Sequence, residues 1–144
     1  MVESARREGA QVLLGGQRPD GAALAAGAFY RPTILGGLAR DAHVVREEIF
    51  GPVLCALTFE DEDDLLEQAN DSVYGLASGI WTADYRRAWR VAKRLEAGSV
   101  WINTYKQLSI STPFGGFKQS GIGREKGVSG LRLYQQSKGI YFGM

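Results

Sequence analysis

Two adjacent carboxylates, Glu47 and Glu48, lie in a short stretch that also carries Phe50, Gly51 and Pro52. Two carboxylates share acid and base work only when both side chains reach the same site. Neighbouring residues point to opposite faces of a strand, and they diverge by roughly 100° in a helix with about 3.6 residues per turn. We therefore expect only one of Glu47 and Glu48 to serve a given site.

The Gly51-Pro52 pair is expected to turn the chain immediately after these carboxylates. Proline disfavours helical geometry at the residue before it, so a helix over residues 43–50 should end here and a strand should follow. Glu48 and Phe50 would then lie on a rigid corner.

One cysteine, Cys55, and one histidine, His43, are the only such residues in the chain. They cannot supply the nitrogen and sulfur ligands that zinc prefers, so no metal site is predicted. A single cysteine excludes an intrachain disulfide and fits a reducing compartment. Cys55 lies in an apolar run, where burial would raise the thiol pKa, and it is not predicted to be a catalytic nucleophile.

Composition favours a small soluble protein. A length of 144 residues with 44% apolar content suits one domain with a real core. Seventeen basic and sixteen acidic residues leave a net charge of +1, so neither nucleic acid nor an anionic membrane is an expected partner. The longest strictly apolar run, residues 53–57, is far shorter than the roughly 20 residues that span a bilayer, and no signal peptide is evident. We expect a cytoplasmic protein.

Strands and helices are predicted to alternate through the middle of the chain. The nearly continuous apolar run at residues 53–59 is typical of a strand covered on both faces. Strands are also predicted at residues 78–82 and 99–103, with helices at residues 60–71 and 84–98. The sequence therefore predicts an α/β fold with a parallel sheet and flanking helices.

The helix predicted at residues 84–98 has two contrasting faces. Its apolar face should point inward and consists of Tyr85, Ala88, Trp89, Ala92 and Leu95. Its other face carries Arg86, Arg87, Arg90, Lys93 and Arg94. A nucleic-acid patch is one interpretation, but we favour a solvated surface because the chain is nearly neutral and no stacking aromatics accompany these charges.

A long irregular segment runs from Thr104 to Arg124, and such loops are more often functional than decorative. Its glycines match neither nucleotide-binding fingerprint, because Gly121, Gly123 and Gly127 have the wrong spacing and no Gly-Lys-Ser/Thr ending is present.

Four stretches together resemble the NAD(P)-dependent aldehyde dehydrogenase superfamily, in order and along essentially the whole chain. They are residues 47–52 (EEIFGP), 74–77 (YGLA), 97–103 (AGSVWIN) and 113–125 (PFGGFKQSGIGRE). The resemblance is to the C-terminal portion of such an enzyme. It implies that residues 1–136 are the C-terminal portion of the catalytic domain and that residues 137–144 are an oligomerisation strand. The nucleotide-binding domain, the nucleophilic cysteine and the general base would lie outside this chain.

The family oxidises an aldehyde to a carboxylic acid with NAD or NADP, through a cysteine thiohemiacetal and an acyl-enzyme. The resemblance therefore implies a small-molecule aldehyde substrate and a homo-oligomer, dimer or tetramer, while the chain alone should be inactive. Which aldehyde is used stays open, as does a preference for an acidic aldehyde through Lys106. The alternative is a truncated, non-catalytic module that folds or associates with a partner.

The resemblance also implies roles for single residues. Glu48 matches the glutamate that accepts hydrogen bonds from the nicotinamide ribose, and Phe50 matches the aromatic residue beside that ribose. The positions that match the lining of the aldehyde tunnel are Tyr105, Leu108 and Phe114, although Phe114 could instead belong to the core.

Glu125 matches a family glutamate behind the active site that relays a proton in some members. A buried carboxyl with a raised pKa could perform this step. A salt bridge within the loop is the alternative role for Glu125.

Overall fold

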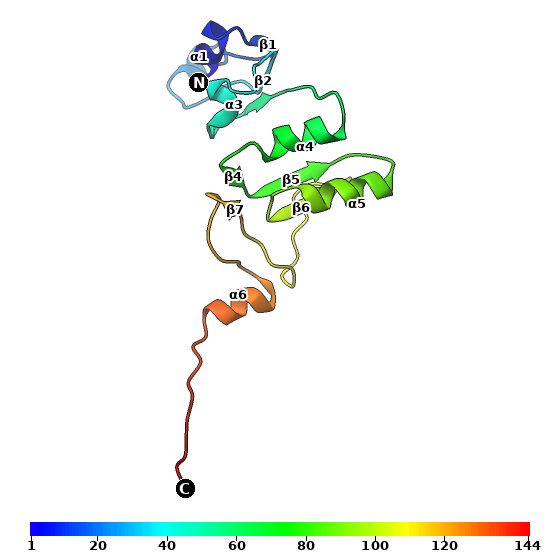
Figure 1. Ribbon diagram of the computed structural model, residues 1–144. Helices are drawn as coiled ribbons and strands as arrows, with labels where there is room; N and C mark the ends of the chain where they lie inside the picture. Colours follow the sequence, from blue (N-terminus) through cyan, green and yellow to red (C-terminus); the bar gives the residue numbers. More distant parts are fainter. The chain divides into compact units, whose positions relative to one another are not determined.

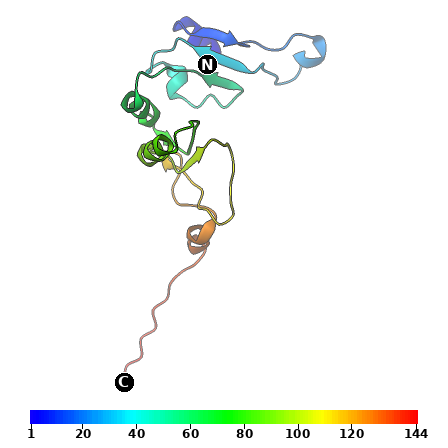
Figure 2. The ribbon, with the colours of Figure 1, turned by 90° about the vertical axis from the view of Figure 1, so that its right-hand side faces the viewer.

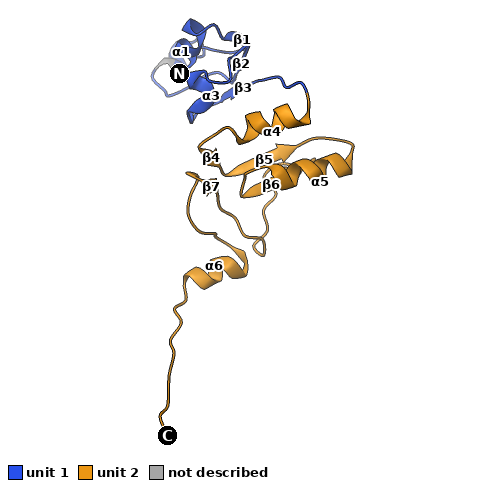
Figure 3. Ribbon diagram, in the orientation of Figure 1, with its two compact units in different colours: residues 1–60 blue, residues 61–144 orange. Residues whose placement is uncertain are grey.

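A computed structural model describes residues 1–24 and 26–144, with short helices and strands in alternation (Figure 1; turned view in Figure 2). The chain divides into two compact units, residues 1–60 and residues 61–144 (Figure 3). Unit 1 contains α1 (Val2–Arg7), β1 (Gln11–Leu14), α2 (Ala22–Ala25), β2 (Thr33–Gly36), α3 (His43–Arg46) and β3 (Val53–Cys55). Unit 2 contains α4 (Glu62–Asn70), β4 (Tyr74–Gly75), β5 (Ala77–Ile80), α5 (Tyr85–Arg94), β6 (Ser99–Ile102), β7 (Phe117–Lys118) and α6 (Gly127–Leu133).

Unit 1 is built on a three-stranded sheet in the order β1-β2-β3. The central strand, β2, runs antiparallel to β1 and parallel to β3. The core beside the sheet combines Val2 and Ala5 from α1, Leu35 from β2 and Val44 from α3. This small core holds the chain on both sides of the corner that carries Glu48.

The strand β3 is shorter and more exposed than the apolar run at residues 53–59 predicts. Val53 and Cys55 pack against the core, whereas Leu54 points to the other face and is 58% exposed. Successive side chains of a strand alternate between faces, so a core on one side covers only every second residue. The prediction of a strand covered on both faces is wrong for this chain by itself.

Unit 2 contains the predicted strand, helix and parallel strand. β5 pairs in parallel with β6 in the register Ala77↔Ser99 to Ile80↔Ile102, and α5 connects the two strands. β4 pairs with β7 in an antiparallel ladder. The sequence predicted that the strands of residues 53–59, 78–82 and 99–103 belong to one parallel sheet. This is confirmed for β5 and β6. The strand β3 instead pairs with β2 in the sheet of unit 1.

Aspartates begin the two long helices of unit 2. A side-chain oxygen of Asp61 accepts hydrogen bonds from the backbone N–H groups of Asp63 and Asp64 at the start of α4. Asp84 caps α5 in the same way, as predicted. These bonds satisfy N–H groups that have no partner within the helix. The helices α4 and α5 lie side by side in both views (Figure 1, Figure 2).

The apolar side of α5 differs from the predicted one. Ala88 and Val91 are buried, whereas Tyr85 is 75% exposed and Trp89 is 61% exposed. With about 100° between successive residues, Trp89 lies roughly 130° around the helix from the centre of a stripe formed by Ala88 and Val91, well outside it. The predicted inward orientation of Tyr85 and Trp89 is therefore wrong.

No strand forms at residues 138–142 among the described residues. The chain leaves α6 after Leu133, and the large apolar side chains of Ile140, Tyr141 and Phe142 are exposed. A strand needs a neighbour for its hydrogen bonds, and this segment pairs with no described strand.

Candidate functional site

The chain is not helical at residues 47–50, where the sequence predicts the end of a helix. The helix α3 ends at Arg46, and Glu47 already has φ −100° and ψ 148°. Extended backbone carries the chain far enough for Ile49 to pack against the core of unit 1. Glu48 and Phe50, on either side of Ile49, are exposed, and Phe50 is 92% exposed.

The backbone of Phe50 has an uncommon conformation, with φ at 53°. Bulky residues rarely adopt the left-handed region, and such residues persist where the surrounding structure holds them. The next residues supply that support, because the carbonyl of Gly51 accepts a hydrogen bond from Val53 N at 2.8 Å. The carbonyl of Pro52 accepts one from Thr33 N, also at 2.8 Å.

Thr33 is itself fixed, so the corner is attached to a buried part of β2. The side chain of Thr33 is 2% exposed, and its hydroxyl donates to the Arg31 carbonyl while it accepts from Gly16 N, both at 2.8 Å. The corner therefore presents, on an anchored backbone, a carboxylate and an aromatic ring whose side chains have no partner among the described residues. A carboxylate in this position can accept two hydrogen bonds from a diol, and a ring can pack on a planar group.

The loop after β6 is closed by Trp101. Its indole Nε1 donates to the Gln107 carbonyl at 2.7 Å. Its ring also meets the ring of Tyr105 edge to face, with centroids 5.7 Å apart and an interplanar angle of 72°. On the other side, the side-chain amide of Asn103 donates to the Thr82 carbonyl and accepts from Thr82 N, both at 2.9 Å. The loop that carries Tyr105 is thus held at both ends.

A cavity of about 470 Å³ lies beside this loop, within the size range of small-molecule sites. Leu108 lines it, together with Trp101 and Pro113, whereas Tyr105 and Phe114 do not. Of the three predicted tunnel residues, the described cavity therefore includes one.

Phe114 and Glu125 face each other across the glycine-rich segment. Phe114 N donates to the Glu125 carbonyl at 2.8 Å, and Glu125 N donates to the Phe114 carbonyl at 2.7 Å. Phe114 is half-buried and Glu125 is exposed. Neither expected environment of Glu125 is present, because the residue is not buried and forms no ion pair with any described residue.

Lys118 ties the glycine-rich segment to the rest of unit 2. Its Nζ donates to the carbonyls of Asn70 at 2.6 Å and Ser72 at 3.0 Å, and it lies 2.6 Å from Glu96 Oε2. A close approach of glycines adds to this anchor, because a Cβ on Gly98 would overlap the Gly115 carbonyl oxygen. Only glycine fits at position 98.

Cys55 has the environment expected from the sequence. Its Sγ lies 3.6 Å from the carbonyl oxygen of Val44 and packs against the core of unit 1. Burial raises the pKa of the Cys55 thiol. A raised pKa leaves less thiolate at neutral pH, and the thiolate is the nucleophilic form.

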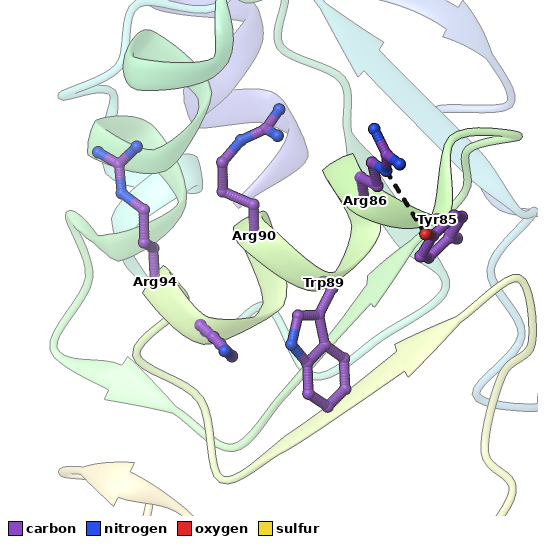
Figure 4. Close-up of a pocket in the computed structure, with 6 residues that line it drawn as sticks. Tyr85, Arg86, Trp89, Arg90 and Arg94 are labelled. Carbon is purple, nitrogen blue, oxygen red and sulfur yellow. Dashed lines mark hydrogen bonds between the residues drawn. The ribbon is translucent and has the colours of Figure 1, made fainter.

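A second, more open hollow lies along α5 (Figure 4). Trp89 projects to one side of the helix, while Arg90 and Arg94 project to the other. Because Tyr85 and Trp89 are exposed, aromatic rings do accompany the basic residues here, contrary to the sequence-based argument. Three of the five basic residues are nevertheless paired, since Arg87 and Arg90 bind Glu62 and Arg94 binds Asp63.

No cluster of three or more potential metal ligands occurs among the described residues, and none of the described helices has the length and apolar character needed to cross a membrane.

A family model described as "Aldehyde dehydrogenase family" matches residues 1–140. The chain belongs to the aldehyde dehydrogenase family. It is 46% identical over 140 residues to betaine aldehyde dehydrogenase of Agrobacterium fabrum. This alignment covers 97% of this chain and 28% of that protein. The Bacillus subtilis betaine aldehyde dehydrogenase is also 46% identical over 140 residues, covering 97% of this chain and 29% of the relative. The chain thus spans less than a third of the length of these relatives.

Solved structures of the aldehyde dehydrogenase family share this fold. Betaine aldehyde dehydrogenase of Staphylococcus aureus in complex with NAD+ superposes with a TM-score of 0.88 at 44% identity, covering 92% of this chain and 26% of that one. An NAD+ complex of aldehyde dehydrogenase from Bacillus cereus superposes with a TM-score of 0.87 at 44% identity. The match covers 94% of this chain and 27% of that one. The mixed α/β fold of this chain is therefore that of a part of an aldehyde dehydrogenase.

Within this aldehyde dehydrogenase chain, the predicted site residues fall into two groups. Glu48 and Phe50 belong to unit 1, and Tyr105, Leu108, Phe114 and Glu125 belong to unit 2. Two further residues, which no sequence motif singled out for a role, hold the second group in place. Trp101 was a motif member without a role, and Lys126 follows Glu125 with its ammonium 5.8 Å from the centroid of Phe114. Both contacts depend on backbone geometry, which no residue pattern revealed.

Proposed function

We propose that this chain is the C-terminal part of an NAD-dependent aldehyde dehydrogenase and supplies portions of its cofactor and aldehyde sites. One observation carries the proposal: the family model matches residues 1–140, although the relatives are more than three times as long. Relatives with solved structures hold NAD+, which favours NAD over NADP. A cytoplasmic location remains part of the proposal.

The reaction oxidises an aldehyde to a carboxylic acid through a thiohemiacetal and an acyl-enzyme on a cysteine outside this chain. The bound cofactor supplies the hydride acceptor. Cys55 cannot replace that cysteine, because its thiol is packed against a core and its pKa is raised. The chain alone is therefore inactive in this proposal.

Glu48 and Phe50 fit the ribose and nicotinamide end of the cofactor. The Glu48 carboxylate is exposed on an anchored corner, and an ionised carboxylate accepts two hydroxyl hydrogen bonds at once. The exposed ring of Phe50 provides an apolar surface beside it. Both groups would hold the sugar and orient the ring that it carries.

Unit 2 provides one wall of the aldehyde tunnel in this proposal. Tyr105, Leu108 and Phe114 line it, and Trp101 holds the loop that carries Tyr105. Glu125 relays a proton from the attacking water. That role requires a buried carboxyl group. The Glu125 side chain is exposed in this chain, so another part of the enzyme would have to bury it.

Glu48→Gln tests the proposal in a complete enzyme. A suitable protein is a chimera in which this chain replaces the matching segment of the 46% identical Bacillus subtilis relative. Glu48→Gln should slow NADH formation, and the rate with a C1-deuterated aldehyde should show a larger isotope effect than in the parent chimera. Looser positioning of the cofactor ring would make hydride transfer more rate-limiting.

Glu47→Gln is the matched control, because Glu47 is the exposed neighbour of Glu48 without a cofactor role in this proposal. It should leave both the rate and the isotope effect unchanged. Equal effects of the two substitutions, or an unchanged rate with Glu48→Gln, would show that the role of Glu48 is wrong. A parent chimera that oxidises no aldehyde would overturn the proposed function itself.

A second candidate function is association without catalysis, and the exposed apolar surface favours it. Fully or largely exposed side chains include Phe50 at 92%, Ile110 at 89%, Ile122 at 106% and Phe142 at 93%. Such surface is typical of a part that is covered by other subunits or domains. Residues 137–144 would supply an assembly strand for a dimer or tetramer.

Sedimentation of the 144-residue chain at several concentrations tests this candidate. Association that weakens on removal of residues 137–144 supports it. A stable monomer with sharp spectroscopic signals of tertiary structure contradicts it, because such a chain would be stable without a partner to bury its apolar surface.

A further inference from the structure

Two lysine ammonium groups lie over the two aromatic rings that the proposed function places in the aldehyde tunnel. Lys106 Nζ lies 5.4 Å from the ring centroid of Tyr105, and Lys126 Nζ lies 5.8 Å from that of Phe114. Both distances are within the range of about 6 Å for attraction between a cation and an aromatic ring. Each ring therefore already has a positively charged neighbour from this chain.

Backbone conformation contributes to the position of both lysines. Lys106 has φ 56° and Lys126 has φ 60°, which is uncommon for residues other than glycine. The loop of Lys106 is closed by the bond from Trp101 to the Gln107 carbonyl. Lys126 follows the paired backbone bonds between Phe114 and Glu125, and the next amide, Gly127 N, donates to the Ile110 carbonyl at 2.9 Å.

Neither ammonium is neutralised within the described part of the chain. Lys106 and Lys126 form no ion pair with a described carboxylate, in contrast to Lys118, which lies 2.6 Å from Glu96. Two ammonium groups without an ion-pair partner among the described residues therefore accompany the rings, with the unpaired Glu125 carboxylate next to Lys126 in the sequence. They attract an anionic group and repel a cationic one.

A quaternary ammonium ligand is bound by aromatic faces that are free to meet it. We propose that this chain disfavours aldehydes with a quaternary ammonium group and prefers aldehydes with a carboxylate, with Lys106 and Lys126 as the residues that set this preference. The inference rests on the proposed function. It distinguishes the chain from its relatives, several of which are named betaine aldehyde dehydrogenase.

Three aldehydes test the inference in the chimera described above. Betaine aldehyde and 3,3-dimethylbutanal have nearly the same shape and differ in a charged nitrogen against a neutral carbon. Succinic semialdehyde carries a carboxylate. The measured quantity is the ratio of kcat/KM for two aldehydes in one preparation, so any inactive or misfolded fraction cancels.

The double substitution Lys106→Met and Lys126→Met should raise kcat/KM for betaine aldehyde relative to 3,3-dimethylbutanal by about tenfold, the order expected when two nearby like charges are removed. It should lower kcat/KM for succinic semialdehyde relative to 3,3-dimethylbutanal. Replacement of both lysines by arginine keeps the charges and should leave both ratios close to those of the parent chimera.

Lys93→Met is the matched control. Lys93 Nζ lies 5.3 Å from the ring centroid of Trp89 on α5, a similar contact outside the loops of Tyr105 and Phe114. This substitution should change neither ratio. Unchanged ratios in the double methionine variant, or an equal change with Lys93→Met, would overturn the inference while the proposed function stands. A parent chimera without activity would overturn both.

Discussion

Arg90 binds Glu62 through a two-pronged ion pair, in which Nε and Nη2 of the arginine each donate to a different carboxylate oxygen at 2.6 Å. The pair joins α5 to α4, and Arg94 reaches Asp63 at 2.7 Å one turn further along. The acidic first turn of α4 thus neutralises much of the basic face of α5. This arrangement lowers the net positive charge that α5 presents to a polyanion.

The Arg90–Glu62 pair should be visible in the titration of Glu62. The hydrogen bond and charge of Arg90 lower the pKa of Glu62 from its ordinary value of 4.5. Because the folded pKa is below the unfolded one, the pair stabilises the folded chain above pH 4.5, and this contribution is lost as the pH falls through the folded pKa. Arg90→Met should raise the pKa of Glu62, as measured by NMR of its side-chain carboxyl carbon.

Arg86→Met is the control for that titration, because Arg86 contacts the Tyr85 ring and hydroxyl instead of Glu62. It should leave the Glu62 titration nearly unchanged. The same midpoint in the Arg90→Met variant and in the unsubstituted chain would contradict the pairing.

Gly98→Ala should loosen the contact between β6 and the glycine-rich segment. A Cβ at this position would overlap the carbonyl oxygen of Gly115, and backbone cannot move aside as a flexible side chain can. Overpacking of this kind typically costs about 1–3 kcal/mol. Hydrogen exchange should show weaker protection of the amides of Ser99 and Asn103, which donate to Leu76 and Ile80.

The control for Gly98→Ala is Gly143→Ala, since a Cβ there has no atom within 4 Å. Protection in β6 should be the same as in the unsubstituted chain. If Gly98→Ala also left these amides fully protected, the close approach of Gly98 and Gly115 would be wrong.

Periodicity and capping predicted the regular part of unit 2 well. Asp84 begins α5 as expected, and the β-rich runs at residues 78–82 and 99–103 became the parallel pair β5 and β6. The predicted helix end at Gly98 was several residues late, because α5 stops at Arg94 and Leu95 is extended. Helix ends depend on tertiary contacts that an apolar stripe does not encode.

Burial was harder to predict than secondary structure. The apolar character of Leu54 and Trp89 indicated buried positions, yet both are more than half exposed. The hydrophobicity of a side chain indicates that it favours burial. It does not indicate whether the same chain provides the residues that would bury it. The same limit applies to the oligomerisation strand expected at residues 137–144, which pairs with no strand in the described part of the chain.

The candidate site came from motif resemblance, and its geometry could not have been derived from residue types. The sequence predicted a helix through Phe50, whereas the helix α3 ends at Arg46, Glu47 is extended and Phe50 adopts a left-handed conformation. Non-local bonds, such as the one from Thr33 N to the Pro52 carbonyl, hold this corner. A local pattern contains no information about such partners.

Lys118→Met should destabilise the β4–β7 ladder. The substitution removes a cation from two backbone carbonyls and from Glu96, and hydrogen bonds to charged groups contribute about 1.5–3 kcal/mol when shielded from water. The site is partly open to solvent, so we expect a loss of about 1 kcal/mol. Hydrogen exchange at Gln119 N, which donates to the Val73 carbonyl at 2.9 Å, measures the effect.

Lys93→Met serves as the comparison for Lys118→Met, because its ammonium contacts only the exposed ring of Trp89 in the interactions of the described chain. Its effect on Gln119 exchange should be negligible. Similar exchange rates in both variants would exclude an anchoring role for Lys118.

Cys55 should react slowly with alkylating agents in the folded chain. Packing against the core raises the pKa of its thiol above the ordinary value of 9.0, so little thiolate exists near neutral pH, and the thiolate is the reactive form. The alkylation rate by iodoacetamide, followed by mass spectrometry, should rise with a midpoint above pH 9.0. Urea should lower the midpoint toward the ordinary value and increase the rate at pH 7. Because the folded pKa is the higher one, ionisation of Cys55 above this pH favours the unfolded chain. Alkylation of the folded chain at pH 7 as fast as that of the urea-unfolded chain would instead indicate an accessible, activated thiol and would reopen a chemical role for Cys55.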